Sequence, residues 1–174
     1  MNKEDARKLG RNLRSSLSNG ERAFEEEAVL SQLKEICRDV EVIGCYVSVK
    51  DELDTRRFIA WCLEEKKTVA VPKVEGGTLG FYRIESFEDL VPAPFSILEP
   101  KNGAGKIDLS SIGMMIVPAL AIDCEGNRVG YGRGYYDSVL SAGMDAVGII
   151  FRGQLVDRID ADPWDVKLSR VITG

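Results

Sequence analysis

The sequence contains no histidine among its 174 residues. Histidine is the commonest transition-metal ligand in proteins and the usual general base near neutral pH. Its absence excludes Ser-His and Cys-His nucleophilic schemes and any zinc site built on histidine. Any chemistry in this chain must rely on Lys, Arg, Asp, Glu, Tyr, backbone amides and a bound metal ion that prefers oxygen ligands.

Cysteines are few and widely spaced, at Cys37, Cys45, Cys62 and Cys124. No two of them form a C-x-x-C motif, so the sequence carries no redox or zinc motif of that kind. Each lies beside apolar residues in a segment expected to belong to the core. We therefore expect reduced thiols.

Long apolar runs are also missing. No stretch of about 18 apolar residues is present, and the charged start MNKEDARK lacks the apolar run of a signal peptide. Neither a membrane span nor export is indicated, and we expect a cytoplasmic protein. The net charge of −5 and the absence of a dense basic block argue against nucleic acid. An acidic protein can still hold an anion in a local basic cleft.

The pattern of apolar residues indicates a layered α/β fold. A chain of 174 residues with 44% hydrophobic content fits one domain, residues 1–174, with a substantial core. Helical periodicity predicts helices over 20–38 and between 55 and 66. Apolar or β-branched runs predict strands over 40–49, 68–74, 79–84, 114–118 and 146–151. Strands alternating with helices imply an α/β domain, and the Gly- and Pro-richer segment 76–105 is interpreted as a hairpin strand and a loop over the site.

The most informative segment is 117–140, VPALAIDCEGNRVGYGRGYYDSVL. An apolar strand leads into a loop with glycines at 126, 130, 132 and 134, and a helix is expected to start at Tyr135. Arg128 and Arg133 add positive charge, and Asp137 is a hard oxygen ligand suited to the magnesium of a polyphosphate. The spacing matches neither common phosphate-binding pattern, and a plain strand-to-helix turn is the alternative. The two arginines, the acid and the Tyr-Tyr pair favour a phosphate site.

The same segment resembles the hallmark of the 5-formyltetrahydrofolate cyclo-ligases, also called 5,10-methenyltetrahydrofolate synthetases, which is similar to P-x-L-x-F-D-x-x-G-x-R-L-G-x-G-x-G-Y-Y-D. Ile122 and Val129 replace the usual Phe and Leu, which should affect packing rather than chemistry. The resemblance implies a three-layer α/β/α domain with a mixed, largely parallel central sheet. The matching residues are Pro118, Leu120, Asp123, Gly126, Arg128, Gly130, Gly132, Gly134, Tyr135, Tyr136 and Asp137.

The resemblance also implies ATP and Mg²⁺. Lys3 and Arg7 share one face of an expected N-terminal helix, and the family uses such a Lys-x-x-x-Arg for ATP. A solvated basic face is the alternative, because further basic residues follow. The implied metal ligands are Asp137 and Asp165; Trp164 replaces a usual polar residue before Asp165, and its alternative role is to pack the end of the sheet. The implied nucleotide-binding residues are Lys3, Arg7, Arg128, Gly130, Gly132, Arg133, Gly134, Tyr135 and Tyr136.

On the folate side, the segment 46–55 resembles a family segment with E-x-[DE]-T, in which Glu52 is similar to a glutamate that contacts folate. Val47 is expected to line the same pocket. Tyr131 and Tyr135 are aromatic candidates for contact with the pterin or formyl region, and packing of the loop on its own helix is the alternative, above all for Tyr136. The implied substrate-binding residues are Val47, Glu52, Tyr131, Gly132, Arg133, Gly134 and Tyr135, and the catalytic candidates are Arg128, Arg133 and Tyr135.

The activity implied by the resemblance is ATP-driven cyclisation of 5-formyltetrahydrofolate to 5,10-methenyltetrahydrofolate. It requires positioning more than a protein nucleophile, which agrees with the absence of histidine. An ATP-dependent enzyme acting on another formamide or amide, and a folate- or nucleotide-binding protein without catalysis, stay open as alternatives. The expected partner is a small-molecule folate, with or without a polyglutamate tail, and the expected assembly is a monomer or a weak homo-oligomer.

Overall fold

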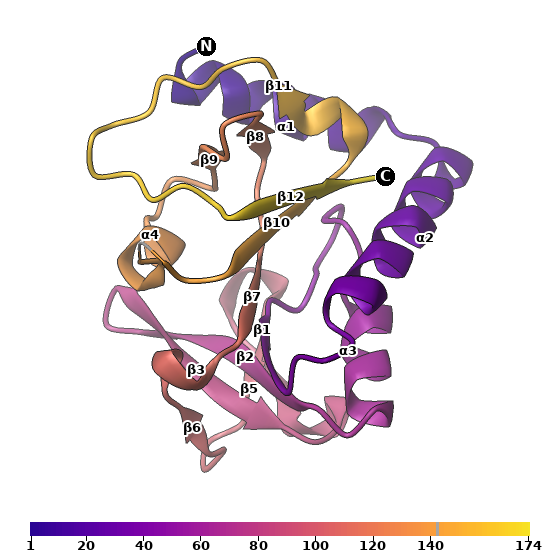
Figure 1. Ribbon diagram of the computed structural model, residues 1–174, viewed down its shortest axis with the longest axis vertical. Helices are drawn as coiled ribbons and strands as arrows, with labels where there is room; N and C mark the ends of the chain where they lie inside the picture. The colour runs from indigo at the N-terminus through magenta and orange to yellow at the C-terminus, as the bar shows by residue number, and fades with distance from the viewer. Residues whose placement is uncertain (142) are drawn as a thin grey trace.

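The structure, a computed structural model, describes residues 1–141 and 143–174 (Figure 1). A seven-stranded sheet with the order β12-β10-β7-β1-β2-β3-β6 runs through the molecule. Its neighbouring strands pair in parallel from β12 to β2, and β3 pairs antiparallel with β2 and with β6. The prediction of a mixed, largely parallel sheet is confirmed. The strands are β1 (Val42–Cys45), β2 (Thr68–Glu75), β3 (Thr78–Ile84), β6 (Lys106–Ile107), β7 (Met114–Val117), β10 (Ala146–Ile150) and β12 (Arg170–Thr173).

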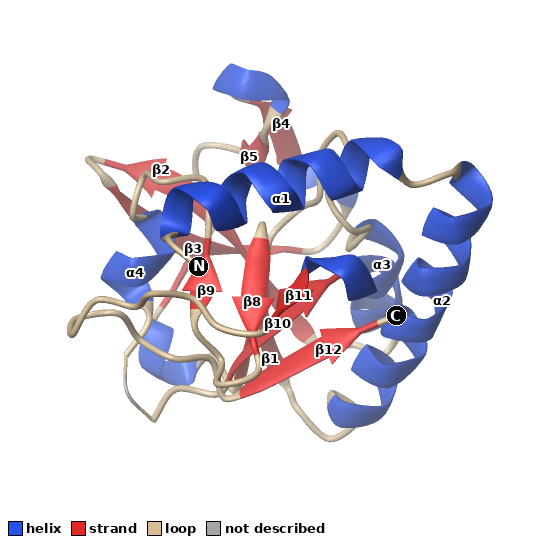
Figure 2. Cartoon of the chain, turned by 90° about the horizontal axis from the view of Figure 1, so that it is seen from above, coloured by secondary structure: helices blue, strands red, loops and turns tan. Residues whose placement is uncertain are grey.

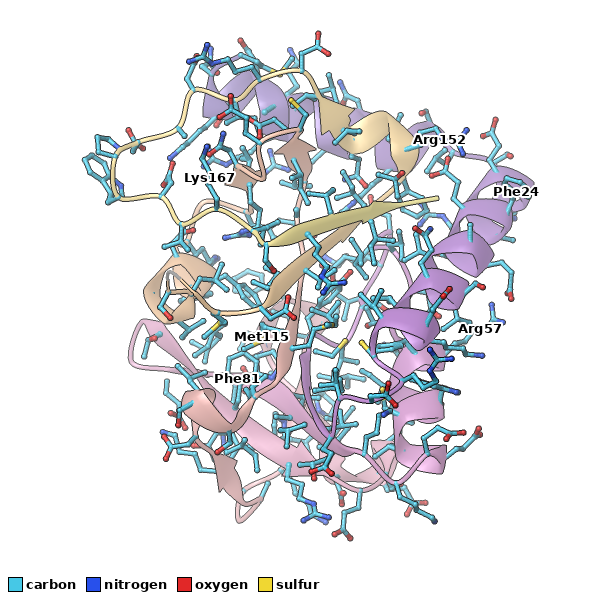
Figure 3. The ribbon with its side chains drawn as sticks, viewed as in Figure 1. Phe24, Arg57, Phe81, Met115, Arg152 and Lys167 are labelled. Atoms are coloured by element: carbon cyan, nitrogen blue, oxygen red, sulfur yellow. The ribbon has the colours of Figure 1, made fainter. Side chains whose placement is uncertain are left out.

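Helices cover both faces of this sheet (Figures 1 and 2). On one face pack α2 (Asn19–Ile36) and α3 (Arg56–Glu64), which share a core cluster with Met114 and Ile116 of β7. On the other face the short helix α4 (Tyr135–Val139) packs in a second cluster with Met115 and Val117. Figure 3 labels Met115 and Phe81 of this second cluster. Because successive side chains of a strand point to opposite faces, β7 contributes to both cores.

The N-terminal helix α1 (Lys3–Ser16) lies across the end of the sheet in the view of Figure 2. The side chain of Asn2 caps it by accepting from the backbone N–H of Asp5 at 2.8 Å. Gly10 faces the segment after β7, and a Cβ there would overlap the carbonyl oxygen of Leu120. Close approach of α1 to the strands therefore depends on this glycine.

Smaller elements complete the chain. A second sheet has the order β11-β8-β9, and β4 pairs with β5 in a two-stranded ribbon. These strands are β4 (Leu90–Pro92), β5 (Leu98–Pro100), β8 (Ala121–Asp123), β9 (Arg128–Val129) and β11 (Leu155–Val156). The 3₁₀ segments are η1 (Phe87–Asp89), η2 (Pro94–Ser96), η3 (Leu109–Ser111) and η4 (Arg152–Gln154).

The expected helices and strands are found, with ends that differ by a few residues. The cysteine prediction is wrong in one case: Cys37, Cys45 and Cys62 are buried free thiols, but Cys124 is exposed, in the turn after β8. Burial raises the pKa of Cys37 and of Cys62 to about 12, so these two stay protonated. Within the described residues, no helix is long and apolar enough to cross a membrane.

Candidate functional site

A cavity of about 500 Å³ opens at the carboxyl ends of β1 and β7, beneath α1. In sheets with parallel strands, ligands commonly bind outside the carboxyl ends of strands where the chain turns to opposite sides. Here β1 lies between β7 and β2, so the cavity occupies such a place. Every residue that the sequence analysis assigned to the site lines it: Lys3, Arg7, Val47, Glu52, Arg128, Gly130, Tyr131, Gly132, Arg133, Gly134, Tyr135, Tyr136, Asp137 and Asp165.

Lys3 and Arg7 of α1 face the cavity, with side chains only 26% and 21% exposed. The Lys3 Nζ atom lies 2.6 Å from carboxylate oxygens of both Asp162 and Asp165. Partial burial opposes its charge, but the hydrogen bonds that Lys3 donates to these two acids raise the pKa of Lys3 above its usual value. Arg7 donates from Nε to the carbonyl oxygen of Gly130 at 3.0 Å. The alternative of a solvated basic face does not describe these two side chains.

Asp123 anchors the hairpin that precedes the glycine loop. Its fully buried carboxylate accepts hydrogen bonds from the backbone N–H groups of Glu125, Asn127 and Ile159 and from the Asn127 side chain, at 2.8–3.0 Å. Burial opposes ionisation, but these bonds together lower the pKa of Asp123. Gly126, with φ +86°, lies in this β8–β9 turn and not in the anion loop that the sequence analysis drew from 126 to 134.

The loop over 130–134 joins β9 to α4. Gly132 and Gly134 have φ values of +95° and +71°, a backbone region that favours glycine. Arg128 lies beneath the loop, with a side chain 6% exposed; its Nη1 donates to the Pro118 carbonyl at 3.0 Å. Its Nε is buried without a partner among the described residues. A buried donor of this kind needs an acceptor.

Arg133 extends to the other side of the loop, where its guanidinium lies 4.8 Å from the ring centre of Phe95. Phe95 belongs to η2, between β4 and β5, and both residues line the cavity. The expected loop over the site within 76–105 is thus confirmed. Phe95 itself was not predicted; an isolated Pro-Phe-Ser carries no motif, and only the fold brings it here.

The two acidic residues assigned to magnesium are both paired with cations. The Asp137 carboxylate accepts from Arg128 Nη2 at 3.1 Å, and that of Asp165 lies against Lys3. Although burial acts in the opposite direction, the Lys3 bond and the backbone N–H of Asp162 lower the pKa of Asp165. In the described part of the chain, no group of three or more acidic or thiol side chains is placed to hold a metal. Trp164 is 75% exposed, so the interpretation that it packs the end of the sheet is wrong.

Glu52 also lines the cavity, from the turn that follows β1. One carboxylate oxygen accepts from the backbone N–H of Val49 at 3.0 Å, and the other accepts from the Tyr131 hydroxyl at 3.1 Å. Burial raises the pKa of Glu52 despite these bonds. The Tyr131 hydroxyl in turn accepts from Arg14 Nη1 at 2.6 Å.

Arg14 is a residue of this site region that the sequence analysis treated only as part of a basic face. A signal was present: Arg14 follows Lys3 by eleven residues and Arg7 by seven, which places all three on one face of a helix. Its side chain is only 3% exposed, whereas Lys8 and Arg11 on α1 are exposed.

The two tyrosines of α4 differ in environment. Tyr136 packs against both hydrophobic clusters, and its ring centre lies 5.7 Å from the guanidinium carbon of Arg128. Its hydroxyl is buried without a partner among the described residues, and burial raises its pKa far above the usual value. The packing role considered for Tyr136 is therefore present. Tyr135 is only partly buried and lines the cavity.

These features define a mixed α/β protein with a cavity that brings together cations, a glycine loop, carboxylates and apolar side chains. The whole chain, residues 1–174, matches the 5-formyltetrahydrofolate cyclo-ligase family. The chain belongs to this family of enzymes.

Similar proteins agree with this assignment. The 5-formyltetrahydrofolate cyclo-ligase of Haemophilus influenzae is 27% identical, with 94% of this chain and 93% of the relative covered. That of Escherichia coli K12 is 30% identical over 75% of this chain and 76% of the relative. The NMR structure of 5,10-methenyltetrahydrofolate synthetase from Aquifex aeolicus is 31% identical and superimposes with a TM-score of 0.85, covering 97% of this chain and 88% of that structure.

Proposed function

We propose that this chain converts 5-formyltetrahydrofolate to 5,10-methenyltetrahydrofolate in a reaction that consumes ATP, requires Mg²⁺ and releases ADP and phosphate. The observation that carries the proposal is a cavity that gathers cations from α1 and from the glycine loop together with Glu52. A reaction between a polyphosphate and a folate requires both ligands to meet in one place, and this cavity offers groups for each.

The nucleotide side fits an anion. Lys3, Arg7, Arg128 and Arg133 line it, and the buried Arg128 Nε lacks an acceptor among the described residues. Gly132 leaves the loop backbone open, since the nearest atoms to a Cβ there would be those of the Arg7 guanidinium at 3.7 Å. A phosphate oxygen supplies the acceptor that such groups need, and charge-assisted bonds of this kind are strong.

The carboxylates fit a magnesium ion that arrives with the nucleotide. Mg²⁺ usually retains several waters and takes one or two protein carboxylates together with substrate phosphates. Asp137 and Asp165, which both line the cavity, would be those two ligands. When bound, the ion neutralises charge on the polyphosphate oxygens. Release of these acids from Arg128 and Lys3 would also free both cations to contact phosphate.

On the folate side, the Glu52 carboxylate can accept hydrogen bonds from N–H donors of a ligand. Apolar side chains of the cavity suit a flat ring. Val47, Leu79, Ile97 and Tyr135 also line the cavity. Pockets for small molecules typically combine apolar walls with a few fixed polar groups. This composition supports a heteroaromatic substrate with N–H donors.

The chemistry requires the formyl oxygen to become a leaving group. Transfer of the γ-phosphoryl group to that oxygen breaks its bond to ADP and produces a phosphorylated iminium. N10 of the same folate then attacks the formyl carbon and loses its proton to solvent, and phosphate leaves with the former formyl oxygen. The role of the protein is to align the reacting atoms and to stabilise phosphoryl charge through Arg128 and Arg133. No side chain has to act as a nucleophile, which agrees with a chain that contains no histidine.

The proposal is tested by omission. Purified protein is mixed with 5-formyltetrahydrofolate, ATP and Mg²⁺, and the near-ultraviolet absorbance of the methenyl product is followed together with phosphate release. We expect product only when all three components are present. Folate binding without product would point to a binding protein. An ATP hydrolysis rate that added folate does not change would point to another amide or formamide substrate.

Two pairs of variants assign the ends of the cavity. Asp137→Asn should raise the concentration of Mg²⁺ needed for half activity and the KM for ATP. Glu52→Gln should raise the KM for 5-formyltetrahydrofolate. Asp39→Asn and Glu35→Gln are matched controls, because both side chains are exposed and lie outside the cavity. Equal kinetics in a test variant and its control would contradict the role given to that residue.

A further inference from the structure

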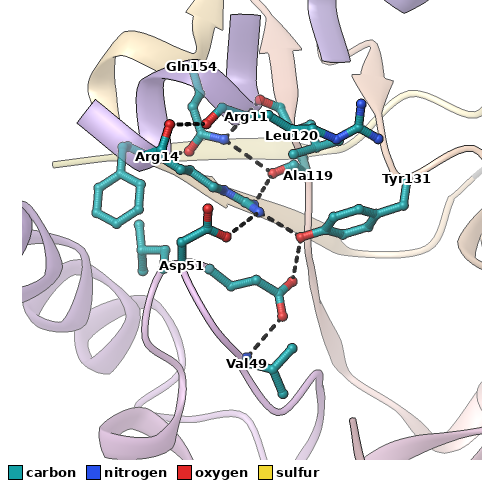
Figure 4. A network of polar contacts seen from close by, with 12 residues as sticks. Arg11, Arg14, Val49, Asp51, Ala119, Leu120, Tyr131 and Gln154 are labelled. Carbon is teal, nitrogen blue, oxygen red and sulfur yellow. Dashed lines mark hydrogen bonds and ion pairs between the residues drawn. The ribbon is translucent and has the colours of Figure 1, made fainter. Parts of the chain in front are cut away.

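The guanidinium of Arg14 lies inside the protein, at the junction of three segments (Figure 4). With its side chain only 3% exposed, it donates from Nη2 to the Ala119 carbonyl at 2.7 Å and from Nη1 to the Tyr131 hydroxyl at 2.6 Å. A carboxylate oxygen of Asp51 lies 3.8 Å from Nη1. A buried arginine is costly unless its hydrogen bonds are satisfied. Both Nη atoms of Arg14 have partners, whereas its Nε is buried without one among the described residues.

The bonds have a direction. Arg14 is only a donor, so the Tyr131 oxygen accepts from it and the Tyr131 proton points to Glu52. Burial and the nearby Glu52 charge raise the pKa of Tyr131 to about 12, so the hydroxyl keeps its proton near neutral pH. With Val49 bonded to the other oxygen, both oxygens of the Glu52 carboxylate are held.

The same contacts join parts of the chain that are far apart in sequence. Arg14 comes from α1, Tyr131 from the glycine loop, and Glu52 from the turn after β1. Arg22 braces the junction by donating to the backbone carbonyls of Arg14 at 2.9 Å and Asp51 at 3.0 Å. The orientation of Glu52 thus depends on groups from two other segments of the chain.

We infer that Arg14 is a positioning residue: through the Tyr131 hydroxyl it holds the Glu52 carboxylate in one orientation for contact with the folate. This inference rests on the proposed function, because it takes Glu52 to be a folate contact. It also gives Tyr131 a role different from the ring contact expected from the sequence. The Tyr131 hydroxyl bridges Arg14 and Glu52, although Tyr131 itself lies in the loop assigned to the nucleotide.

The test uses Tyr131→Phe, Arg14→Met, Arg14→Lys and the double variant Arg14→Met/Tyr131→Phe, with Arg11→Met as an exposed control on the same helix. Tyr131→Phe deletes only the bridging hydroxyl. We expect it to raise the KM for 5-formyltetrahydrofolate about tenfold, equivalent to about 1.4 kcal/mol, with the KM for ATP changed by less than about twofold. Arg14→Met should raise the folate KM at least as much, and Arg14→Lys should restore part of the loss.

The double variant separates positioning from general damage. If both residues act in one chain of bonds, Tyr131→Phe adds little to Arg14→Met, and the two effects are strongly non-additive. Additive effects, or a rise in both KM values together, would overturn the inference. A folate KM in Tyr131→Phe equal to that of Arg11→Met would overturn it as well. This comparison can be made even if Arg14→Met fails to fold.

Assays of the unmodified protein separate a failure of the proposed function from a failure of the role given to Arg14. Absence of product from the unmodified chain would refute the proposed function itself. An active unmodified chain with unaffected Tyr131→Phe kinetics would refute only the role of Arg14.

Discussion

Replacing Gly130 by alanine is expected to displace Arg128. A Cβ at residue 130 would lie 2.6 Å from Arg128 Nη1, closer than real Cβ contacts. The φ value of Gly130 is not positive, so alanine suits the backbone there and the effect is steric. The guanidinium has little room to retreat, because Pro118 and Asp137 hold it and the rest of the side chain is buried.

The size of the effect follows from the bonds at risk. A hydrogen bond to a charged group contributes about 1.5–3 kcal/mol, and each 1.4 kcal/mol is a factor of ten. Loss of one productive bond from Arg128 to phosphate should therefore lower kcat/KM for ATP by about 10- to 100-fold. The free energy of unfolding should fall by about 1 kcal/mol, because the Pro118 contact is strained as well.

The assay is product formation at varied ATP with saturating folate, together with thermal unfolding. Gly20→Ala is the matched control, because no atom lies within 4 Å of a Cβ at that helical position. If Gly130→Ala keeps the ATP dependence of Gly20→Ala, then Arg128 is either free to move or not engaged with the nucleotide, and the reasoning fails.

Four further predictions concern α1 and Glu52. Gly10→Ala should lower the melting temperature by several degrees and raise the KM for ATP, because its Cβ would overlap the Leu120 backbone and push α1 outward; an unchanged melting curve would contradict this. Lys3→Met should raise the KM for ATP and leave the KM for folate unchanged, as measured by steady-state kinetics with each substrate varied in turn. Because burial raises the pKa of Glu52, its ionised form is lost at a higher pH than for a free glutamate, and the folate KM should rise as pH falls through that raised value. The same shift means that the contribution of Glu52 to stability decreases as pH rises through its folded pKa, so Glu52→Gln should melt at pH 7 no lower than the unmodified chain.

Much of the site could be predicted because its residues form continuous motifs. The segment from Pro118 to Asp137 carries its glycines, arginines and acid at fixed spacing, and the chain folds this segment locally into a hairpin, a loop and a short helix. The spacing of four places Lys3 and Arg7 on one helical face, but only the resemblance to the family favoured a ligand role over a solvated basic face. Periodicity also predicted the main strands, since their buried runs are short and bounded by polar residues.

What the sequence did not reveal depends on contacts between distant segments. Arg14 shares a helical face with Arg7, but so does the exposed Arg11. The burial of Arg14 follows only from the docking of α1 over the Ala119 carbonyl. Gly126 belongs to the hairpin rather than the anion loop. The Asp123 carboxylate fixes this turn by accepting hydrogen bonds from the backbone N–H groups of Glu125 and Asn127. Cys124 lies in that same turn, where an apolar neighbourhood in sequence does not produce burial.

The most direct test of the central claim is the fate of the formyl oxygen. The protein is given 5-formyltetrahydrofolate labelled with ¹⁸O in the formyl group, together with ATP and Mg²⁺, and the released phosphate is analysed by mass spectrometry. The account predicts one labelled oxygen in phosphate for each methenyltetrahydrofolate formed, because the γ-phosphoryl group departs with that oxygen. Unlabelled phosphate alongside product would contradict phosphoryl transfer to the substrate in this cavity.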